Sequence, residues 1–181
     1  LPIPFACVAA DLSTGKQVVL DKGELPLCMR ATMAIPGVFA PVEIDGKVLV
    51  DGGIINNFPV DVAKSMGADI IIGVDIKNDY PGPENLKSMP QVFAQMIALM
   101  GNESYQRNLK EVDILIKPDV SNYSTYSFNK PAIAQLTKNG YAAAKEKYAE
   151  LQDLANKLNT LALADTPQTV RKATDVVRDT F

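Results

Sequence analysis

The chain has 181 residues, of which 47% are hydrophobic and 22% are charged, and its formal net charge is −3. This length and composition suit one globular core, and the acidic balance gives no reason to expect a nucleic-acid partner. Histidine is absent, which excludes His-containing triads and imidazole metal sites within this chain. Cys7 and Cys28 form no CxxC pair, so we expect buried free thiols and no metal or redox cofactor.

The first part of the chain alternates short apolar segments with turns. The pattern predicts strands over 3–10, 17–20, 42–44, 47–50 and 69–76, and short helices over 25–34 and 59–66. Asp45-Gly46 lies between two of these strands and is typical of a two-residue hairpin turn. A helix that leads into an apolar strand buried on both faces, as over 59–76, favours a parallel α/β topology.

The second part of the chain is predicted to be mainly helical. The expected elements are a helix over 88–110, a strand over 112–117, a long helical stretch over 131–158 and a weakly amphipathic segment over 166–181. Ser88 and Gln91 have the spacing of a capping box, which predicts where the first of these helices begins.

Asp51 is the carboxylate that stands out by its position. It follows the apolar strand predicted over 47–50, at the carboxyl end where α/β folds place their ligands. Gly52 and Gly53 come next, and without a Cβ they let the backbone turn sharply and let another segment come close. An Asp-Gly pair at a strand end is also typical of an ordinary turn, so position alone leaves both a structural and a catalytic role open.

Several segments around Asp51 occur in a recognisable order. Arg30-Ala-Thr-Met-Ala-Ile-Pro-Gly-Val-Phe39, then the hairpin, then Val50-Asp51-Gly52-Gly53, then Asn57-Phe58-Pro59-Val60, resemble the patatin-like phospholipase family, bacterial type. Segments 3–15 and 63–75 are similar to the parts that flank them there, so the resemblance covers about residues 3–76. It implies an α/β fold of three layers, with a mostly parallel central sheet and flanking helices.

The same resemblance implies a Ser–Asp dyad in which Asp51 is the general base, with Gly52 and Gly53 supporting the motif. The family holds its serine in a G-x-S-x-G elbow, and neither this motif nor the glycine-rich oxyanion loop occurs in the chain. Both lie upstream of the aspartate in the family, and the chain does not begin with Met. We therefore expect residues 1–158 to be the C-terminal portion of the catalytic domain, with its nucleophile-bearing part missing, and 159–181 to be a helical extension or linker.

The expected activity of the whole protein is that of a carboxylic ester hydrolase, similar to phospholipase A or lysophospholipase, acting on a lipid or other ester. The isolated chain is expected to be inactive, and the alternative is a non-catalytic structural or interaction module, such as a pseudoenzyme. Expected partners are the missing N-terminal half, a transiently contacted membrane surface and, through exposed core surface, further copies of the chain. The bacterial members it resembles suggest an envelope or secreted location, with the cytoplasm as the alternative.

A few other residues have competing interpretations. Asp75 ends the strand predicted over 69–76, where a turn or capping role is favoured over a place in the same crevice as Asp51. Met89, Met96 and Met100 recur at rough helical spacing, which favours core packing over the lining of an acyl channel. The aromatic loop over 123–128 fits either a cover for a lipid entrance or a local anchor.

Overall fold

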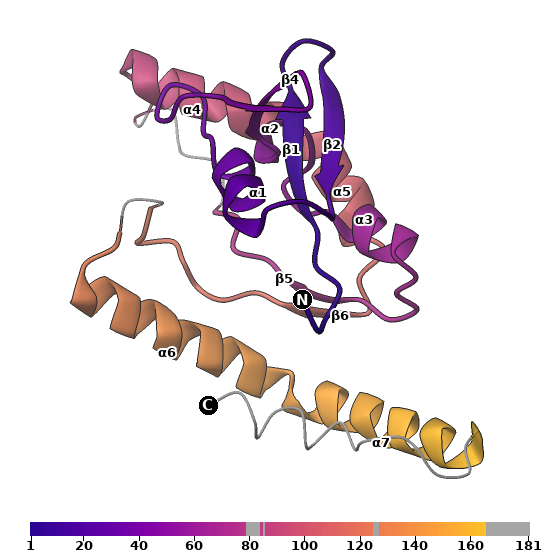
Figure 1. Ribbon diagram of the computed structural model, residues 1–181. Coiled ribbons are helices and arrows are strands. Elements are labelled where there is room, and N and C mark those ends of the chain that lie inside the picture. The colour runs from indigo at the N-terminus through magenta and orange to yellow at the C-terminus, as the bar shows by residue number, and fades with distance from the viewer. Residues whose placement is uncertain (79–83, 85, 125–126, 166–181) are drawn as a thin grey trace. The chain divides into compact units, whose positions relative to one another are not determined.

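The computed structural model describes residues 1–78, 84, 86–124 and 127–165 (Figure 1). The chain divides into two compact units, Leu1–Leu115 and Ile116–Phe181. The segment predicted over 166–181 lies outside the described residues, as does Tyr126 of the aromatic loop.

The first unit contains a four-stranded sheet in the order β2-β1-β4-β3. Its strands are β1 (Cys7–Asp11), β2 (Lys16–Leu20), β3 (Val42–Ile44) and β4 (Lys47–Asp51). All three pairings are antiparallel, so the prediction of a mostly parallel central sheet is wrong for this sheet. The reason is the connections, because tight turns join β1 to β2 and β3 to β4, whereas parallel neighbours need a long crossover.

Two of these turns follow directly from their residues. Asp45 and Gly46 both have positive φ, 49° and 72°, which confirms the two-residue hairpin between β3 and β4. Gly15, in the turn before β2, has a φ of 66°. The predicted strand over 3–10 begins only at Cys7, because Ile3 and Phe5 are exposed to solvent instead of packing on the sheet.

One face of the sheet is covered by helix α1 (Leu25–Thr32). The core between them contains Ala9, Leu20, Cys28, Ala31 and Leu49. Both cysteines are free, with Cys28 buried and Cys7 half-buried, and burial raises the pKa of the Cys7 thiol.

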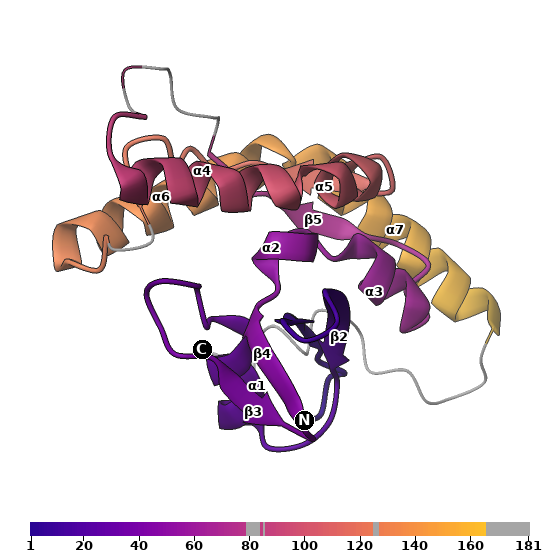
Figure 2. The same ribbon diagram turned by 90° about the horizontal axis from the view of Figure 1, so that it is seen from above.

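The rest of the first unit follows β4 in the chain. Its elements are α2 (Gly53–Asn56), α3 (Val60–Ser65), β5 (Ile72–Val74), α4 (Met89–Met100), α5 (Asn102–Leu109) and β6 (Ile114–Ile116), of which β5 and β6 pair in a separate two-stranded sheet. Seen from above, α2 lies between the four-stranded sheet and the α4–α5 pair (Figure 2), and it contacts β1, α4 and α5. The helical turn that follows Asp51 is therefore enclosed on both sides.

Three expectations for this region need correction. The strand predicted over 69–76 is only three residues long and is not buried on both faces, because Ile72 and Val74 are 48% and 54% exposed. The helix predicted over 88–110 begins at the predicted capping box but is interrupted at Gly101, which separates α4 from α5. Met89, Met96 and Met100 do not pack in the core of the described residues, since they are 79%, 56% and 65% exposed.

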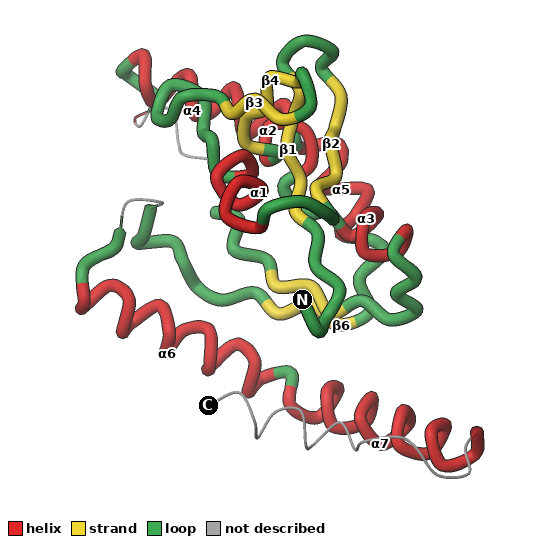
Figure 3. The backbone as a smooth tube through the Cα atoms, viewed as in Figure 1, coloured by secondary structure: helices red, strands yellow, loops and turns green. Residues whose placement is uncertain are grey.

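In its described residues, the second unit begins with non-helical segments over 116–124 and 127–129 and continues as helices. Its helices are α6 (Lys130–Glu146) and α7 (Tyr148–Asp165), which meet at Lys147 (Figure 3). Asn129 caps α6, because its side-chain oxygen accepts a hydrogen bond from the Ala132 N–H at 2.9 Å. Helix α7 continues across residues 158 and 159, between which the sequence placed a domain boundary. That boundary stays a prediction.

Candidate active site at Asp51

Asp51 is the last residue of β4, and its backbone is held on both sides. It pairs with Ala9 of β1, and its N–H donates a hydrogen bond to the Ala34 carbonyl oxygen at 3.0 Å. Ala34 is fully buried in the segment that follows α1. The carboxylate therefore projects from a backbone position that the sheet and the α1 segment fix together.

The Asp51 carboxylate is partly buried and accepts a backbone hydrogen bond. The Gly53 N–H donates to Asp51 Oδ1 at 2.7 Å. Burial raises the pKa of Asp51 above its ordinary value of 3.8, while the Gly53 N–H acts in the opposite direction. A raised pKa makes the ionised carboxylate a stronger proton acceptor than a solvated aspartate.

Gly52 is required by a close approach to β1. A Cβ at Gly52 would lie 2.3 Å from the Val8 carbonyl oxygen, which no real side chain tolerates. Gly53 has a different environment, because a Cβ there would meet Asn57 Oδ1 at 2.7 Å and Asp51 Oδ1 at 3.0 Å. The first glycine lets the turn pack on the sheet, and the second leaves room for the carboxylate itself.

A buried polar network lies at the other end of α2. Asn56 and Asn108 are each 2% exposed, and Asn108 Nδ2 lies 3.0 Å from Asn56 Oδ1. Asn56 Nδ2 donates to Gln17 Oε1 of β2 and to Asp61 Oδ1 of α3, at 2.9 and 2.8 Å. Because buried polar groups are costly unless they are paired, this network fixes α2 against β2, α3 and α5.

Another carboxylate, Asp75, is buried just after β5. It accepts hydrogen bonds from the Tyr105 hydroxyl at 2.8 Å and from the Lys77 N–H at 2.9 Å. The contact with the N–H two residues along fits the turn role that the sequence favoured, while the Tyr105 contact had no local sequence signal.

The sequence missed three residues that surround the Asp51 turn: Asn56, Gly101 and Asn108. A Cβ at Gly101 would lie 2.6 Å from the Gly53 carbonyl oxygen, so the break between α4 and α5 is packed against the turn. Isolated Asn and Gly residues in a helical pattern are ordinary, so only the spatial contacts reveal them.

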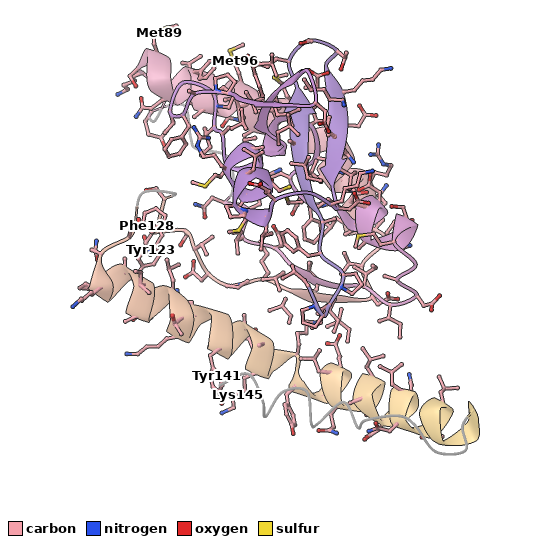
Figure 4. All side chains as sticks on the ribbon, viewed as in Figure 1. Met89, Met96, Tyr123, Phe128, Tyr141 and Lys145 are labelled. Atoms are coloured by element: carbon pink, nitrogen blue, oxygen red, sulfur yellow. The ribbon has the colours of Figure 1, made fainter. Side chains whose placement is uncertain are left out.

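The exposed methionines lie on α4. Figure 4 shows Met89 and Met96 projecting from α4. Asp51 lines neither of two surface hollows, of about 430 and 630 Å³. Among the described residues, no cluster of three or more His, Cys, Asp or Glu could hold a metal ion. No helix in the described part of the chain combines the length and the apolarity that crossing a membrane needs.

A half-buried carboxylate on a glycine turn at a strand end, within a mixed α/β unit, makes Asp51 a candidate functional site. The sequence model of the patatin-like phospholipase family matches residues 5–64, which include this turn. Over these residues the chain is similar to members of that family.

Relatives extend the match beyond residue 64. Over 100 residues the chain is 41% identical to an uncharacterized NTE family protein of Mycobacterium tuberculosis, covering 55% of this chain and 28% of the relative. Over 76 residues it is 38% identical to patatin-like phospholipase domain-containing protein 7 of the mouse, covering 41% of this chain and 6% of that protein. The chain thus spans little more than a quarter of the first relative and a small part of the second.

Proposed function

We propose that this chain supplies the general base, Asp51, of a Ser–Asp dyad in a serine lipid acyl hydrolase of the phospholipase A or lysophospholipase kind. The serine and the oxyanion loop come, on this proposal, from polypeptide outside the chain. The observation that supports it most is the environment of Asp51: a carboxylate half-buried at the end of β4, held by the Gly53 N–H, with its pKa raised by burial.

In the proposed reaction Asp51 accepts and returns a proton twice, first the serine proton and then a proton from water. The serine oxygen attacks the ester carbonyl while its proton passes to the carboxylate, and collapse of the tetrahedral intermediate releases the alcohol, which takes that proton. Water then attacks the acyl-enzyme with Asp51 again accepting a proton, and the fatty acid leaves as the serine is reprotonated. Because Oδ1 already accepts the Gly53 N–H, the proposal assigns the transferred proton to Oδ2.

Backbone N–H groups of the oxyanion loop would stabilise the negative charge on the tetrahedral intermediate. A positioned general base commonly contributes about 10²–10⁴ in rate. An aspartate of ordinary pKa is a weak base toward a serine hydroxyl, so the burial of Asp51 matters because it moves the pKa in the useful direction.

The decisive experiment is Asp51→Asn in the longer protein that contains the serine. Asn keeps an oxygen that accepts the Gly53 N–H, so the turn should persist while the proton acceptor is lost. Asp45→Asn is the matched control, because Asp45 is exposed at the hairpin tip and Asn tolerates its positive φ. We expect ester hydrolysis to fall by about 10²-fold or more in the first variant and to be unchanged in the second. Wild-type turnover by Asp51→Asn would rule out the dyad.

We further propose that the isolated 181-residue chain is inactive and that its exposed apolar surface contacts the nucleophile-bearing half. Large apolar side chains are exposed in the first unit, among them Ile72, Val74 and Ile76 beside one another at β5. Surface of this kind in one copy also favours self-association. Purified chain should therefore elute as more than a monomer in size-exclusion chromatography and should not hydrolyse p-nitrophenyl esters. Hydrolysis above background would contradict the proposal.

The substrate is proposed to be a lipid or other ester at a transiently contacted membrane surface. The location is proposed, from the resemblance to bacterial members, to be the envelope or the outside of the cell, with the cytoplasm as the alternative. An upstream segment without a serine in a glycine-flanked elbow would instead favour the non-catalytic module.

A further inference from the structure

The helix α5 lies beyond residues 5–64, the segment that the family model matches, yet it makes contacts that hold the Asp51 turn. We propose that α5 and the α4–α5 junction position the general base, with Gly101, Ser104 and Asn108 as positioning residues. This inference rests on the proposed function, because it concerns the placement of Asp51.

Gly101 acts through the Gly53 peptide. The φ of Gly101 is −83°, a value that any residue adopts, so the backbone itself does not demand glycine there. Glycine is required at this position by a close contact, because a Cβ would lie 2.6 Å from the Gly53 carbonyl oxygen. The N–H of the same Gly53 donates to Asp51 Oδ1. A methyl group at Gly101 must therefore displace the residue that orients the carboxylate.

Two side chains of α5 hold α2 from the same direction. The Ser104 hydroxyl is hydrogen-bonded to the Ile55 carbonyl oxygen, and Asn108 Nδ2 lies within 3.0 Å of Asn56 Oδ1. Asn108 Nδ2 also lies 2.8 Å from the Phe58 carbonyl oxygen, just beyond the end of α2. Since α2 begins at Gly53, these contacts fix the helix that carries the hydrogen-bond donor to Asp51.

The chemistry explains why such contacts should affect the rate more than substrate binding. Asp51 acts on the serine proton and not on the bulk of the lipid, so its displacement weakens proton transfer while the acyl chain binds as before. A misplacement of about 1 Å in a catalytic group can cost about 10²-fold. The expected signature is a lower kcat with an unchanged KM.

The test uses Gly101→Ala in the longer, active protein, with Gly140→Ala as the matched control. A Cβ at Gly140, in α6, has nothing within 4 Å, so the same chemical change there meets no neighbour. We expect kcat to fall by about 10- to 100-fold in Gly101→Ala with KM within about twofold, and both constants to stay at wild-type values in Gly140→Ala. A wild-type kcat in Gly101→Ala, or a loss confined to KM, would overturn the inference.

Asn108→Ala and Ser104→Ala test the second set of contacts, with the exposed Gln106→Ala on the same helix as control. Asn108→Ala leaves buried acceptors unpaired, so it is expected to lower stability as well as kcat. Ser104→Ala removes only one hydroxyl from a partly buried position, so it is expected to fold and to test the effect on kcat alone. If Asn108→Ala does not fold, a lower kcat with unchanged KM in Ser104→Ala supports the inference, and a wild-type kcat there counts against it.

A structural readout separates this inference from the proposed function. In the same protein, the Gly53 amide proton should be shifted downfield by its bond to the Asp51 carboxylate, and Gly101→Ala should reduce that shift. If Asp51→Asn retains activity, the proposed function fails whatever the spectrum shows. If Asp51→Asn is inactive while Gly101→Ala keeps both the Gly53 resonance and kcat, the positioning role alone is refuted.

Discussion

The substitution Gly52→Ala adds one methyl group at the closest backbone approach in the site. The new Cβ would lie 2.3 Å from the Val8 carbonyl oxygen, 2.5 Å from its carbonyl carbon and 2.8 Å from its Cγ1. The φ of Gly52 is −69°, so the cost is steric contact and not backbone strain. Val8 belongs to β1, which is paired with β2 on one side and β4 on the other, so its backbone cannot withdraw without breaking sheet hydrogen bonds.

Overpacking typically costs about 1–3 kcal/mol, and an immovable backbone neighbour places Gly52→Ala near the top of that range, at about 3 kcal/mol. For a urea dependence of about 2 kcal/mol per M, this lowers the unfolding midpoint by about 1.5 M. Urea unfolding of the 181-residue chain, followed by circular dichroism, measures the change.

Gly53→Ala is the matched comparison one residue further on. Its Cβ would meet the tips of two side chains, Asn57 Oδ1 and Asp51 Oδ1, and the exposed Asn57 can rotate away. We expect a stability change within about 1 kcal/mol, together with a disturbed carboxylate. Equal midpoints for the two variants would refute the reasoning that β1 imposes the requirement at Gly52.

The pH dependence of stability should differ in sign between two aspartates. Burial raises the pKa of Asp51, so its ionised form lowers the stability of the folded state at neutral pH. Asp51→Asn should therefore have a higher Tm than wild type at pH 7. This gain in Tm should disappear as the pH falls below about 4. The Thr14 hydroxyl lowers the pKa of Asp11 from 3.8, so Asp11→Asn should have a lower Tm at pH 7, a deficit that closes as the pH falls through the folded pKa. Asn129→Ala removes the cap of α6 and should destabilise that helix by about 1 kcal/mol, measured by urea unfolding, whereas an unchanged midpoint would show that the cap contributes nothing.

The features that the sequence predicted correctly are those that neighbouring residues decide. Asp45-Gly46 is sufficient for its hairpin because both positive φ angles are local properties of the two residues. The start of α4 was predictable for the same reason, since Gln91 Oε1 accepts the Ser88 N–H at 3.0 Å across a single helical turn. The choice of Asp51 as the general base came from the family resemblance, and it stays a prediction.

The predictions that were wrong depended on distant partners. The parallel sheet was inferred from a helix followed by an apolar strand, but the neighbours of β1 are β2 and β4, and both run antiparallel to it. The prediction of one helix over 88–110 missed the break at Gly101, and nothing in the sequence indicates that the Gly53 carbonyl oxygen leaves no room for a side chain there. The spacing of apolar residues along a helix carries no information about such a contact with a distant segment.

The same distinction applies to the candidate site. The segment that the family model matches ends at residue 64 and contains Asp51 together with the glycines of its turn. The groups that hold the turn from its other side, Gly101 and Asn108, lie well beyond that end. A short motif is therefore enough to recognise the proposed base but not to orient it. The orientation of the Asp51 carboxylate depends, on this inference, on the close packing of α5 against α2, which the missing side chain at Gly101 allows. A chain that kept residues 5–64 but lost this packing would keep the motif and lose the orientation of its carboxylate.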